Sequence, residues 1–146
     1  MRIPATSLKA IITAYIGHLS NRQWDQLPGY FTPNATWWTS GNPALVDQAG
    51  TTSASDHLPA LSQLADMFST YSFDIVNIIG EGDRVMLEGQ AVGKGPQDLV
   101  YVNNITMSFK MTEQGKICDL REYPDHVEIN WLLQWIDDHS NSTTTK

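Results

Sequence analysis

The stretch "GKICDLREYPDHVEI", residues 115–129, combines a strand pattern with the start of a helix, and one acidic residue breaks the strand pattern. Alternate side chains of a strand face opposite sides of the sheet. A strand over Ile117–Pro124 therefore places on one face Cys118, Leu120, Glu122 and Pro124. Glu122 falls on the apolar face. Because burying an unpaired carboxylate is costly, we expect either a cavity or a specific partner around it.

Two interpretations of Glu122 follow from this position. In the first, Glu122 lines a cavity, where burial raises its pKa toward neutrality and makes it a competent acid or base. In the second, Glu122 lies at a solvent-open edge or pairs with a cation such as Arg84 or Arg121, since structural ion pairs also perturb pKa values. The sequence leaves both open.

The chain before this stretch predicts helices first and strands afterwards. Apolar residues at helical spacing indicate a helix from Leu8 to Leu19, and a short second helix is expected over Trp24–Phe31. A strand in residues 34–43 and a loop at residues 45–53 follow, and residues 53–71 carry a third helical pattern. Three β segments come next, divided by turn residues: "YSFDIVNIIG", "RVMLEGQAVGKG" and "LVYVNNITMSFKMT".

The end of the opening stretch predicts a last helix. Asp125 and Glu128 have the spacing of a capping box, and apolar residues continue at helical spacing to Ile136. We expect one α+β domain over residues 1–139, with the helices packed across one curved antiparallel sheet, and a frayed tail over residues 140–146.

Composition limits the classes of function. The 146 residues suit one domain, and a formal charge of -7 without a basic cluster argues against nucleic acid as a partner. No apolar run is long enough to span a bilayer, so no membrane partner is expected. The single cysteine, Cys118, excludes an intrachain disulfide, and the N-terminus indicates an amphipathic helix. These features predict a cytoplasmic protein.

Two phrases carry a resemblance to a known superfamily. The stretch "TAYIGHLSNRQWDQLPGYFTPNATWW" (residues 13–38) is similar to the opening phrase of the nuclear transport factor 2-like superfamily, and "GKICDLREYPDH" (residues 115–126) resembles the final strand of its SnoaL-like polyketide cyclase and ketosteroid isomerase-like branch. The resemblance spans residues 7–136. It implies a cone-shaped fold with helices at the mouth, holding one small apolar ligand.

The resemblance also implies site residues, with departures. Tyr15 matches the position at which ketosteroid isomerases place a tyrosine that stabilises an oxyanion; from helical spacing alone it is equally a core tyrosine bonded to backbone. Thr39 and Met107 stand where those isomerases carry aspartates, which speaks against steroid isomerisation. Gly89 and Ala91 replace acidic and basic residues of limonene epoxide hydrolases.

Other titratable residues each have two interpretations. His57 lies in the first turn of a helix, where it is either an inward neutral imidazole or a surface residue beside Asp56. Asp125 either caps the last helix or transfers protons, as acidic residues of this strand do in SnoaL-like cyclases. His126 follows it, with a side chain suited to proton shuttling.

The predicted substrate-binding residues combine an aromatic pocket with polar groups. Asn103 is the one amide on the apolar face of its strand, and it either holds a substrate carbonyl or satisfies a neighbouring backbone group. Aromatic residues suit a polycyclic substrate, although such spacing also fits plain core. The predicted set is Trp24, Phe31, Trp37, Thr39, Asn103, Met107 and Leu120.

We therefore predict a cofactor-free acid/base enzyme, without a metal, that acts on a polyketide- or terpenoid-derived intermediate through an enol or enolate. The predicted catalytic residues are Glu122, Tyr15, His57, Asp125 and His126. The alternative is a noncatalytic module of the same fold that binds a small ligand or a protein. A homodimer is expected, because Val76, Ile78 and Val92 would otherwise expose apolar surface on the outer sheet face.

Overall fold

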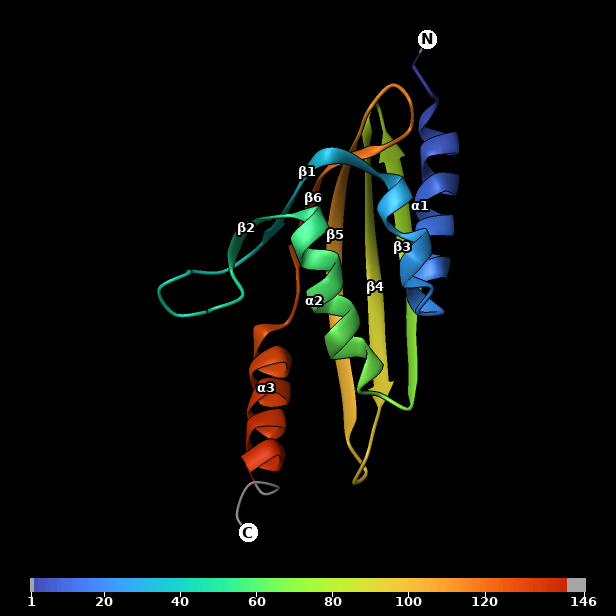
Figure 1. Cartoon of the computed structure of the whole chain (residues 1–146). Coiled ribbons are helices and arrows are strands. Elements are labelled where there is room, and N and C mark those ends of the chain that lie inside the picture. The colour runs from blue at the N-terminus through green and yellow to red at the C-terminus, as the bar shows by residue number, and fades with distance from the viewer. Residues whose placement is uncertain (1, 142–146) are drawn as a thin grey trace.

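The computed structural model describes residues 2–141, which form one six-stranded sheet and its covering helices (Figure 1). In chain order the elements are α1 (Ala5–Ser20), the 3₁₀ helices η1 (Trp24–Gln26) and η2 (Pro28–Tyr30), β1 (Phe31–Thr39), β2 (Gly50–Ser53), α2 (Ala54–Asp66), β3 (Thr70–Glu81), β4 (Arg84–Lys94), β5 (Val100–Met111), β6 (Ile117–Tyr123) and α3 (His126–Asn141).

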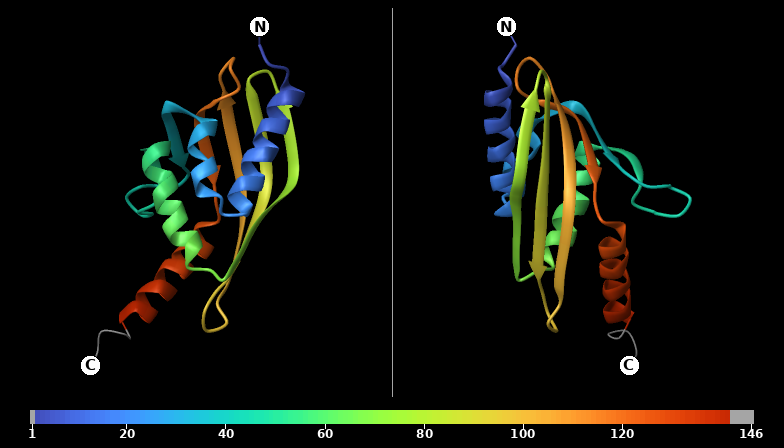
Figure 2. Two further views of the ribbon diagram at one scale, coloured as in Figure 1. Left: turned by 45° about the vertical axis from the view of Figure 1, so that its right-hand side comes forward. Right: turned by 180° about the vertical axis from the view of Figure 1, so that it is seen from behind.

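The strands lie side by side in the order β2-β1-β6-β5-β4-β3. The sheet is curved and open, and α1 and α2 lie across one of its faces (Figure 2). This arrangement confirms the predicted α+β fold with helices packed across a curved sheet. The prediction of a fully antiparallel sheet is wrong at one place: β1 and β6 run parallel, whereas the other neighbours are antiparallel.

Three local predictions need correction. Residues 50–53 form a short edge strand on β1 rather than a loop, because pairing with residues 36–39 orders a segment that has no apolar alternation. The predicted helix over Trp24–Phe31 is two 3₁₀ turns, since Pro28 begins the second turn and has no N–H to continue the first. The last helix extends to Asn141, into the predicted frayed tail; residues 142–146 lie outside the described residues.

Local capping fixes where α2 begins and leaves one irregularity inside it. The Ser53 hydroxyl accepts a hydrogen bond from the Asp56 N–H at 3.1 Å, as an N-cap residue does. Pro59 lies in the second turn of this helix, which begins at Ala54. Because Pro59 has no N–H, the Ser55 carbonyl, four residues earlier, lacks its usual helical donor.

Two clusters of buried side chains hold the layers together. The larger one joins α1 to the sheet and α2, and it contains Tyr15, Trp37 and Phe109, each at most 1% exposed. The smaller cluster fixes α3: Leu132 is fully buried against Phe68 and its neighbours. On the outer face Val76 stays 62% exposed, and the homodimer expected from this face remains a prediction.

Candidate active site

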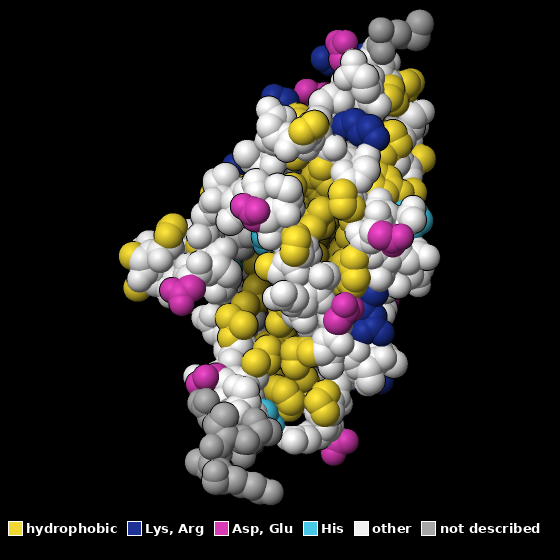
Figure 3. All heavy atoms as spheres, viewed as in Figure 1, with side chains coloured by type: hydrophobic (Ala, Val, Ile, Leu, Met, Phe, Trp, Pro, Cys, Tyr) yellow, Lys and Arg dark blue, Asp and Glu magenta, His cyan; other side chains and the backbone are white. Residues whose placement is uncertain are grey.

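A cavity of about 240 Å³ lies between the inner face of the sheet, α2 and the first turns of α3. On the face that carries the helices, hydrophobic side chains form a band running down the molecule past α2, with acidic side chains scattered around it (Figure 3). The cavity is lined by Thr39, Gln48, His57, Ala60, Leu61, Leu64, Ala65, Phe68, Tyr71, Ala91, Tyr101, Ile105, Glu122, Pro124, Ile129 and Leu133. Its walls are mostly apolar, and its polar side chains come from several elements, among them Glu122 of β6, His57 of α2, Tyr71 of β3 and Tyr101 of β5.

Glu122 is the acidic residue of this cavity. Its Oε2 accepts a hydrogen bond of 2.9 Å from the indole N–H of Trp37, which is 1% exposed. The ladders place Glu122 beside Thr39 of β1 and Met107 of β5, in the middle of the sheet. Burial raises the pKa of the Glu122 carboxyl, and the Trp37 N–H and the nearby His126 ring offset part of that rise. The first interpretation, a carboxyl inside a cavity, is therefore confirmed for its position.

The second interpretation of Glu122 required an arginine partner or an open edge. Arg121 points to the other face of the sheet, where its guanidinium stacks 3.9 Å from the Trp38 ring centroid. Arg84 is exposed and pairs with Lys110 of β5, which lies three residues from Met107 and so faces the opposite side of the sheet from the Met107–Glu122 pair. The partner of the Glu122 carboxylate is an uncharged indole donor, which leaves its protonation free to respond to the cavity.

His57 faces the cavity instead of solvent. Its ring stacks on Trp37 with 3.9 Å between centroids and 15° between planes. Trp37 therefore contacts both titratable groups, through its N–H to Glu122 and through its ring face to His57. Burial lowers the pKa of His57 to about 4, so its imidazole is neutral near pH 7. The inward interpretation of His57 is confirmed.

Two tyrosines of the cavity were not predicted as site residues. Burial raises the pKa of Tyr71, and it raises the pKa of Tyr101 to about 12 although a hydrogen bond from Asn103 opposes the shift. The Asn103 amide N–H donates to the Tyr101 hydroxyl oxygen at 2.6 Å, so the Tyr101 proton is left to donate elsewhere. Both phenols are neutral hydrogen-bond donors near pH 7. Tyr101 shares its strand face with Asn103, which is the signal that could have revealed it.

Asn103 uses its amide within the protein. Besides Tyr101, its Nδ2 donates to the Asp125 carbonyl at 3.2 Å, and its Oδ1 accepts from the Asp125 N–H at 2.9 Å. Asn103 is fully buried. Of the two interpretations offered for this residue, the structure supports the one in which it satisfies a neighbouring backbone group, and its effect on the cavity passes through Tyr101.

Asp125 and His126 have structural tasks at the start of α3. The Asp125 carboxylate accepts the Val127 N–H at 2.9 Å, which confirms its role as a helix cap. His126 Nε2 lies 2.6 Å from the Ser40 carbonyl oxygen and so must donate, which leaves Nδ1 to accept from the Gln48 amide at 3.1 Å. With both ring nitrogens engaged, His126 ties the loop after β1 to α3.

Tyr15 points inward as predicted but does not line the cavity. Its ring is enclosed edge-on by Tyr30, Phe31 and Phe109, with centroids 5.5 to 5.9 Å away. Within residues 2–141 its buried hydroxyl has no hydrogen-bond partner. Burial, followed by the charge of Glu122, raises the pKa of Tyr15. Within residues 2–141, the Tyr15 hydroxyl therefore neither bonds to backbone nor lines the cavity.

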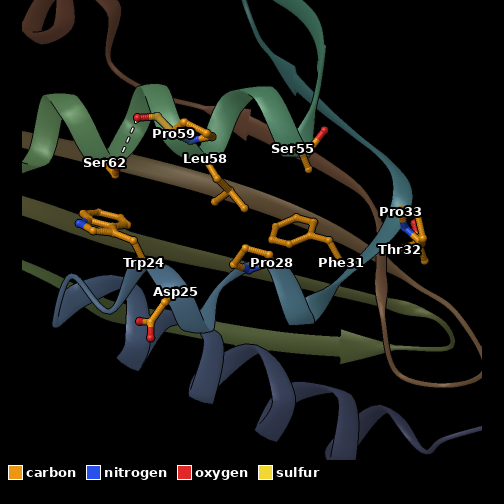
Figure 4. Close-up of a pocket in the computed structure, with 11 residues that line it drawn as sticks. Trp24, Asp25, Pro28, Phe31, Thr32, Pro33, Ser55, Leu58, Pro59 and Ser62 are labelled. Atoms are coloured by element: carbon orange, nitrogen blue, oxygen red, sulfur yellow. Dashed lines mark hydrogen bonds between the residues drawn. The ribbon is translucent and has the colours of Figure 1, made fainter.

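The predicted substrate-binding residues divide among three places. Thr39, which is 4% exposed, lines the cavity. Trp37, Met107 and Leu120 belong to the buried core behind it. Trp24 and Phe31 line a separate, larger pocket on the other side of α2 (Figure 4). The aromatic residues expected to form one pocket thus divide between the separate pocket and the buried core, and none of them lines the Glu122 cavity.

Two further findings concern residues 2–141 as a whole. In this part of the chain, no three histidine, cysteine, aspartate or glutamate side chains come together in a group that could hold a metal ion. Its helices also include none that is long and apolar enough to cross a membrane.

Comparison with known families identifies this architecture. The sequence profile of the SnoaL-like domain matches residues 12–120, which is more than half of the chain. The chain belongs to the SnoaL-like domain family. The resemblance stated from the two sequence phrases is therefore confirmed, including its nuclear transport factor 2-like fold. The profile match ends two residues before Glu122, so the family assignment rests on the scaffold and not on this carboxylate.

Individual proteins and solved structures are also similar to this chain. UPF0523 protein B of Dictyostelium discoideum is 29% identical over 124 residues, covering 82% of this chain and 76% of the relative. The structure of PrhC from Penicillium brasilianum covers 93% of this chain and 91% of its own at 9% identity, with a TM-score of 0.81. A candidate SnoaL-like polyketide cyclase from Shewanella putrefaciens covers 91% and 88% at 12% identity, with a TM-score of 0.70. The two structures share the fold with this chain.

Proposed function

We propose that this SnoaL-like protein is a cofactor-free acid/base enzyme, and that Glu122 moves the proton. The observation that carries the proposal is a carboxyl group with a raised pKa in an apolar cavity, held by the Trp37 N–H at 2.9 Å and accompanied by two tyrosines. A carboxyl whose pKa approaches the working pH is an efficient proton carrier. Each of these groups belongs to the chain itself.

The proposed chemistry is proton transfer at a carbon beside a carbonyl. Glu122, in its ionised form, removes the proton, and the Tyr71 and Tyr101 hydroxyls donate hydrogen bonds to the enolate oxygen that develops. The protonated Glu122 then returns its proton at another carbon, or to a leaving hydroxyl. Isomerisation, ring closure and loss of water all follow from this enolate. The neutral His57 ring holds the indole that orients Glu122 and can accept a hydrogen bond from the substrate.

The cavity limits the class of substrate. A volume of about 240 Å³ is below the range of about 300–1,000 Å³ that is typical of small-molecule sites, which favours a compact molecule. The apolar lining and the carboxylate disfavour anions. We therefore propose a compact, uncharged, enolisable ketone of polyketide or terpenoid type. The fold that this chain shares with a candidate SnoaL-like polyketide cyclase supports this class.

Proton exchange in heavy water tests the proposal without knowledge of the natural substrate. The full chain is incubated in D₂O with a panel of compact cyclic ketones and 1,3-diketones, and loss of the proton signal beside the carbonyl is followed by NMR. The expected result is exchange of at least one ketone far above the rate with the Glu122→Gln variant. A panel in which no ketone exchanges faster with the wild type than with this variant contradicts the proposal. Ketone binding without exchange would favour the alternative, a noncatalytic ligand-binding module.

A further inference from the structure

The Thr39 side chain is a buried polar group on the Glu122 cavity. Thr39 ends β1 two residues after Trp37, so its side chain points to the same, inner face of the sheet. The residue is 4% exposed, and no hydrogen bond among residues 2–141 involves its hydroxyl. This hydroxyl is not enclosed as that of Tyr15 is, and it opens onto the cavity. A hydroxyl that is held away from bulk water without a protein partner can be satisfied by a ligand.

Thr39 lies directly beside Glu122. The parallel ladder of β1 and β6 pairs the two residues, and neighbouring strands are about 4.8 Å apart. The His57 ring, which stacks on Trp37, lines the cavity as well. Within the part of the chain that the structure describes, neither ring nitrogen of His57 has a hydrogen-bond partner. A neutral imidazole offers one donor and one acceptor, and so does the Thr39 hydroxyl.

Two tyrosines supply the other polar groups of the cavity, and their hydrogen-bonding capacity differs from that of Thr39. Tyr71 and Tyr101 pair with Gly93 from its two sides. The Tyr101 oxygen already accepts the Asn103 N–H at 2.6 Å, so this phenol offers its proton to the cavity. A donor matches a carbonyl oxygen, which only accepts. A group that both donates and accepts matches a hydroxyl, which does the same.

The order of these groups across the sheet matches the order of atoms in one class of ketone. Strand β6, with Glu122, lies between β1, with Thr39, and β5, with Tyr101. The carboxyl group therefore comes from a strand between one that carries a hydroxyl-matching group and one that carries a carbonyl-matching group. In a β-hydroxy ketone, the carbon that loses its proton likewise lies between the carbonyl carbon and the carbon that bears the hydroxyl.

We propose that Thr39 binds a hydroxyl group of the substrate, and that the substrate is a compact β-hydroxy ketone. This inference rests on the proposed function, because it takes Glu122 as the group that moves the proton. The Tyr101 hydroxyl donates to the carbonyl oxygen, Glu122 removes the proton from the adjacent carbon, and Thr39 and His57 hold the substrate hydroxyl. Thr39 is thus a residue that determines specificity.

Loss of water from this substrate needs no further reagent. The electron pair of the broken C–H bond passes through the enolate into a new C=C bond, and the bond from carbon to the hydroxyl oxygen breaks. The departing hydroxyl group takes the proton that Glu122 had removed. The products are an unsaturated ketone and water, and Glu122 is ionised again.

The test compares two ketones that differ by one hydroxyl, 3-hydroxycyclohexanone and cyclohexanone. The full chain is incubated with each in D₂O at neutral pH, and NMR follows the loss of protons beside the carbonyl and the formation of cyclohex-2-enone. The wild type should process the hydroxy ketone with the higher kcat/KM. Thr39→Val, which keeps the shape and removes the hydroxyl, should reduce this preference at least about fivefold, as loss of a hydrogen bond to a substrate hydroxyl does. Thr39→Ser, which keeps the hydroxyl, should retain the preference within about twofold.

Thr51→Val is the matched control. It makes the same change at an exposed position of β2 that pairs with Trp38 on the other face of the sheet, and it should keep the preference within about twofold. Melting curves verify that each threonine variant is folded at the assay temperature.

Three outcomes overturn the inference: no preference for the hydroxy ketone in the wild type, an unchanged preference in Thr39→Val, or an equal loss in Thr39→Ser and Thr39→Val. The proposed function is judged separately, by Glu122→Gln with whichever ketone reacts faster. If Glu122→Gln slows that reaction, the proposed function stands while the inference about Thr39 falls. If Glu122→Gln leaves the rate unchanged, both fall.

Discussion

The two sides of α2 differ in chemistry although they share one helix. One side faces a cavity of about 240 Å³ in which Glu122, His57, Tyr71 and Tyr101 all have pKa values displaced by burial. The other side faces a groove of about 570 Å³ whose acidic residue, Asp25, is exposed. The larger pocket is therefore the one with fewer titratable side chains on its lining.

This difference teaches that volume and reactivity are set by different features of the fold. Reactivity on the cavity side comes from the sheet, because Trp37 of β1 and Glu122 of β6 meet inside it. The groove is formed where the sheet is irregular, beside the broken ladder of β1. Strand pairing encloses and orients titratable groups, whereas the interruption of the β1–β6 ladder lies beside the larger pocket.

The largest expected effect separates the two acidic residues. Glu122→Gln should reduce turnover of any substrate found by the exchange assay by about 10²–10⁴-fold, because the amide cannot carry the proton. Asp25→Asn, the matched change in the groove, should leave turnover within twofold. Initial rates of both variants, with folding verified by circular dichroism, make the comparison. Equal losses in the two variants would remove the distinction between the pockets.

The second expected effect is a loss of stability from a substitution in α3, which contributes side chains to the Glu122 cavity. Leu132→Ala should lower the free energy of unfolding by about 3 kcal/mol, since Leu132 is fully buried where α3 packs on the sheet. Val127→Ala, on the same helix but 77% exposed, should change it by less than about 0.5 kcal/mol. Urea denaturation measures both.

The third effect is the pH dependence of stability that His57 creates. Its pKa is lowered from 6.5 to about 4, so between these values the unfolded chain binds a proton that the folded chain does not. Stability from His57 is therefore gained as pH rises through this window, by at most about 3 kcal/mol. Glu122 acts in the opposite direction, because its raised pKa makes stability fall as pH rises above 4.5.

The contribution of His57 is therefore measured in the Glu122→Gln variant, in which the opposing titration of Glu122 is absent. Urea unfolding from pH 4 to 7 should show a rise in stability for Glu122→Gln that is absent from the double variant Glu122→Gln/His57→Gln. Parallel curves for the two proteins would show that His57 titrates as freely in the folded chain as in the unfolded chain.

The smallest effect concerns Asp125, which lies close to the cavity without lining it. Asp125→Ala should lower the free energy of unfolding by about 1 kcal/mol, the usual contribution of a helix cap, because the Val127 N–H loses its acceptor. Turnover should stay within a few-fold of the wild type. A loss of a hundredfold or more, with the helix content intact, would place Asp125 in the chemistry.

Local patterns were enough to predict the class of fold and the position of Glu122. Helical spacing and strand alternation depend on neighbouring residues only, so the inward face of β6 could be read directly from residues 117–124. The parallel pairing of β1 with β6 could not, because it joins segments that are far apart in the sequence. The edge strand at residues 50–53 depends on the same distant pairing and was missed for the same reason.

The surroundings of each side chain explain the remaining differences between the predicted and the observed site. Tyr71 looks like a core residue in the sequence, and the position of the cavity distinguishes it from Tyr15, whose hydroxyl is enclosed by aromatic rings. Asn103 and His126 have side chains suited to a functional site, but their polar atoms are already hydrogen-bonded to backbone and amide groups of other segments. Residue type predicts what a side chain can do, whereas its partners decide whether it is available.

The adjacent position of β1 and β6 also has a consequence for the order of folding. Thr36 of β1 and Asp119 of β6 are bonded at 2.7 Å across 83 residues of chain, whereas β3, β4 and β5 are joined in sequence by short hairpins. Closing long loops is slow, so the hairpins are expected to form before β6 docks on β1. Until that step we expect Glu122 to remain hydrated, and the docking that completes the sheet is also the event that buries its carboxyl group and raises its pKa.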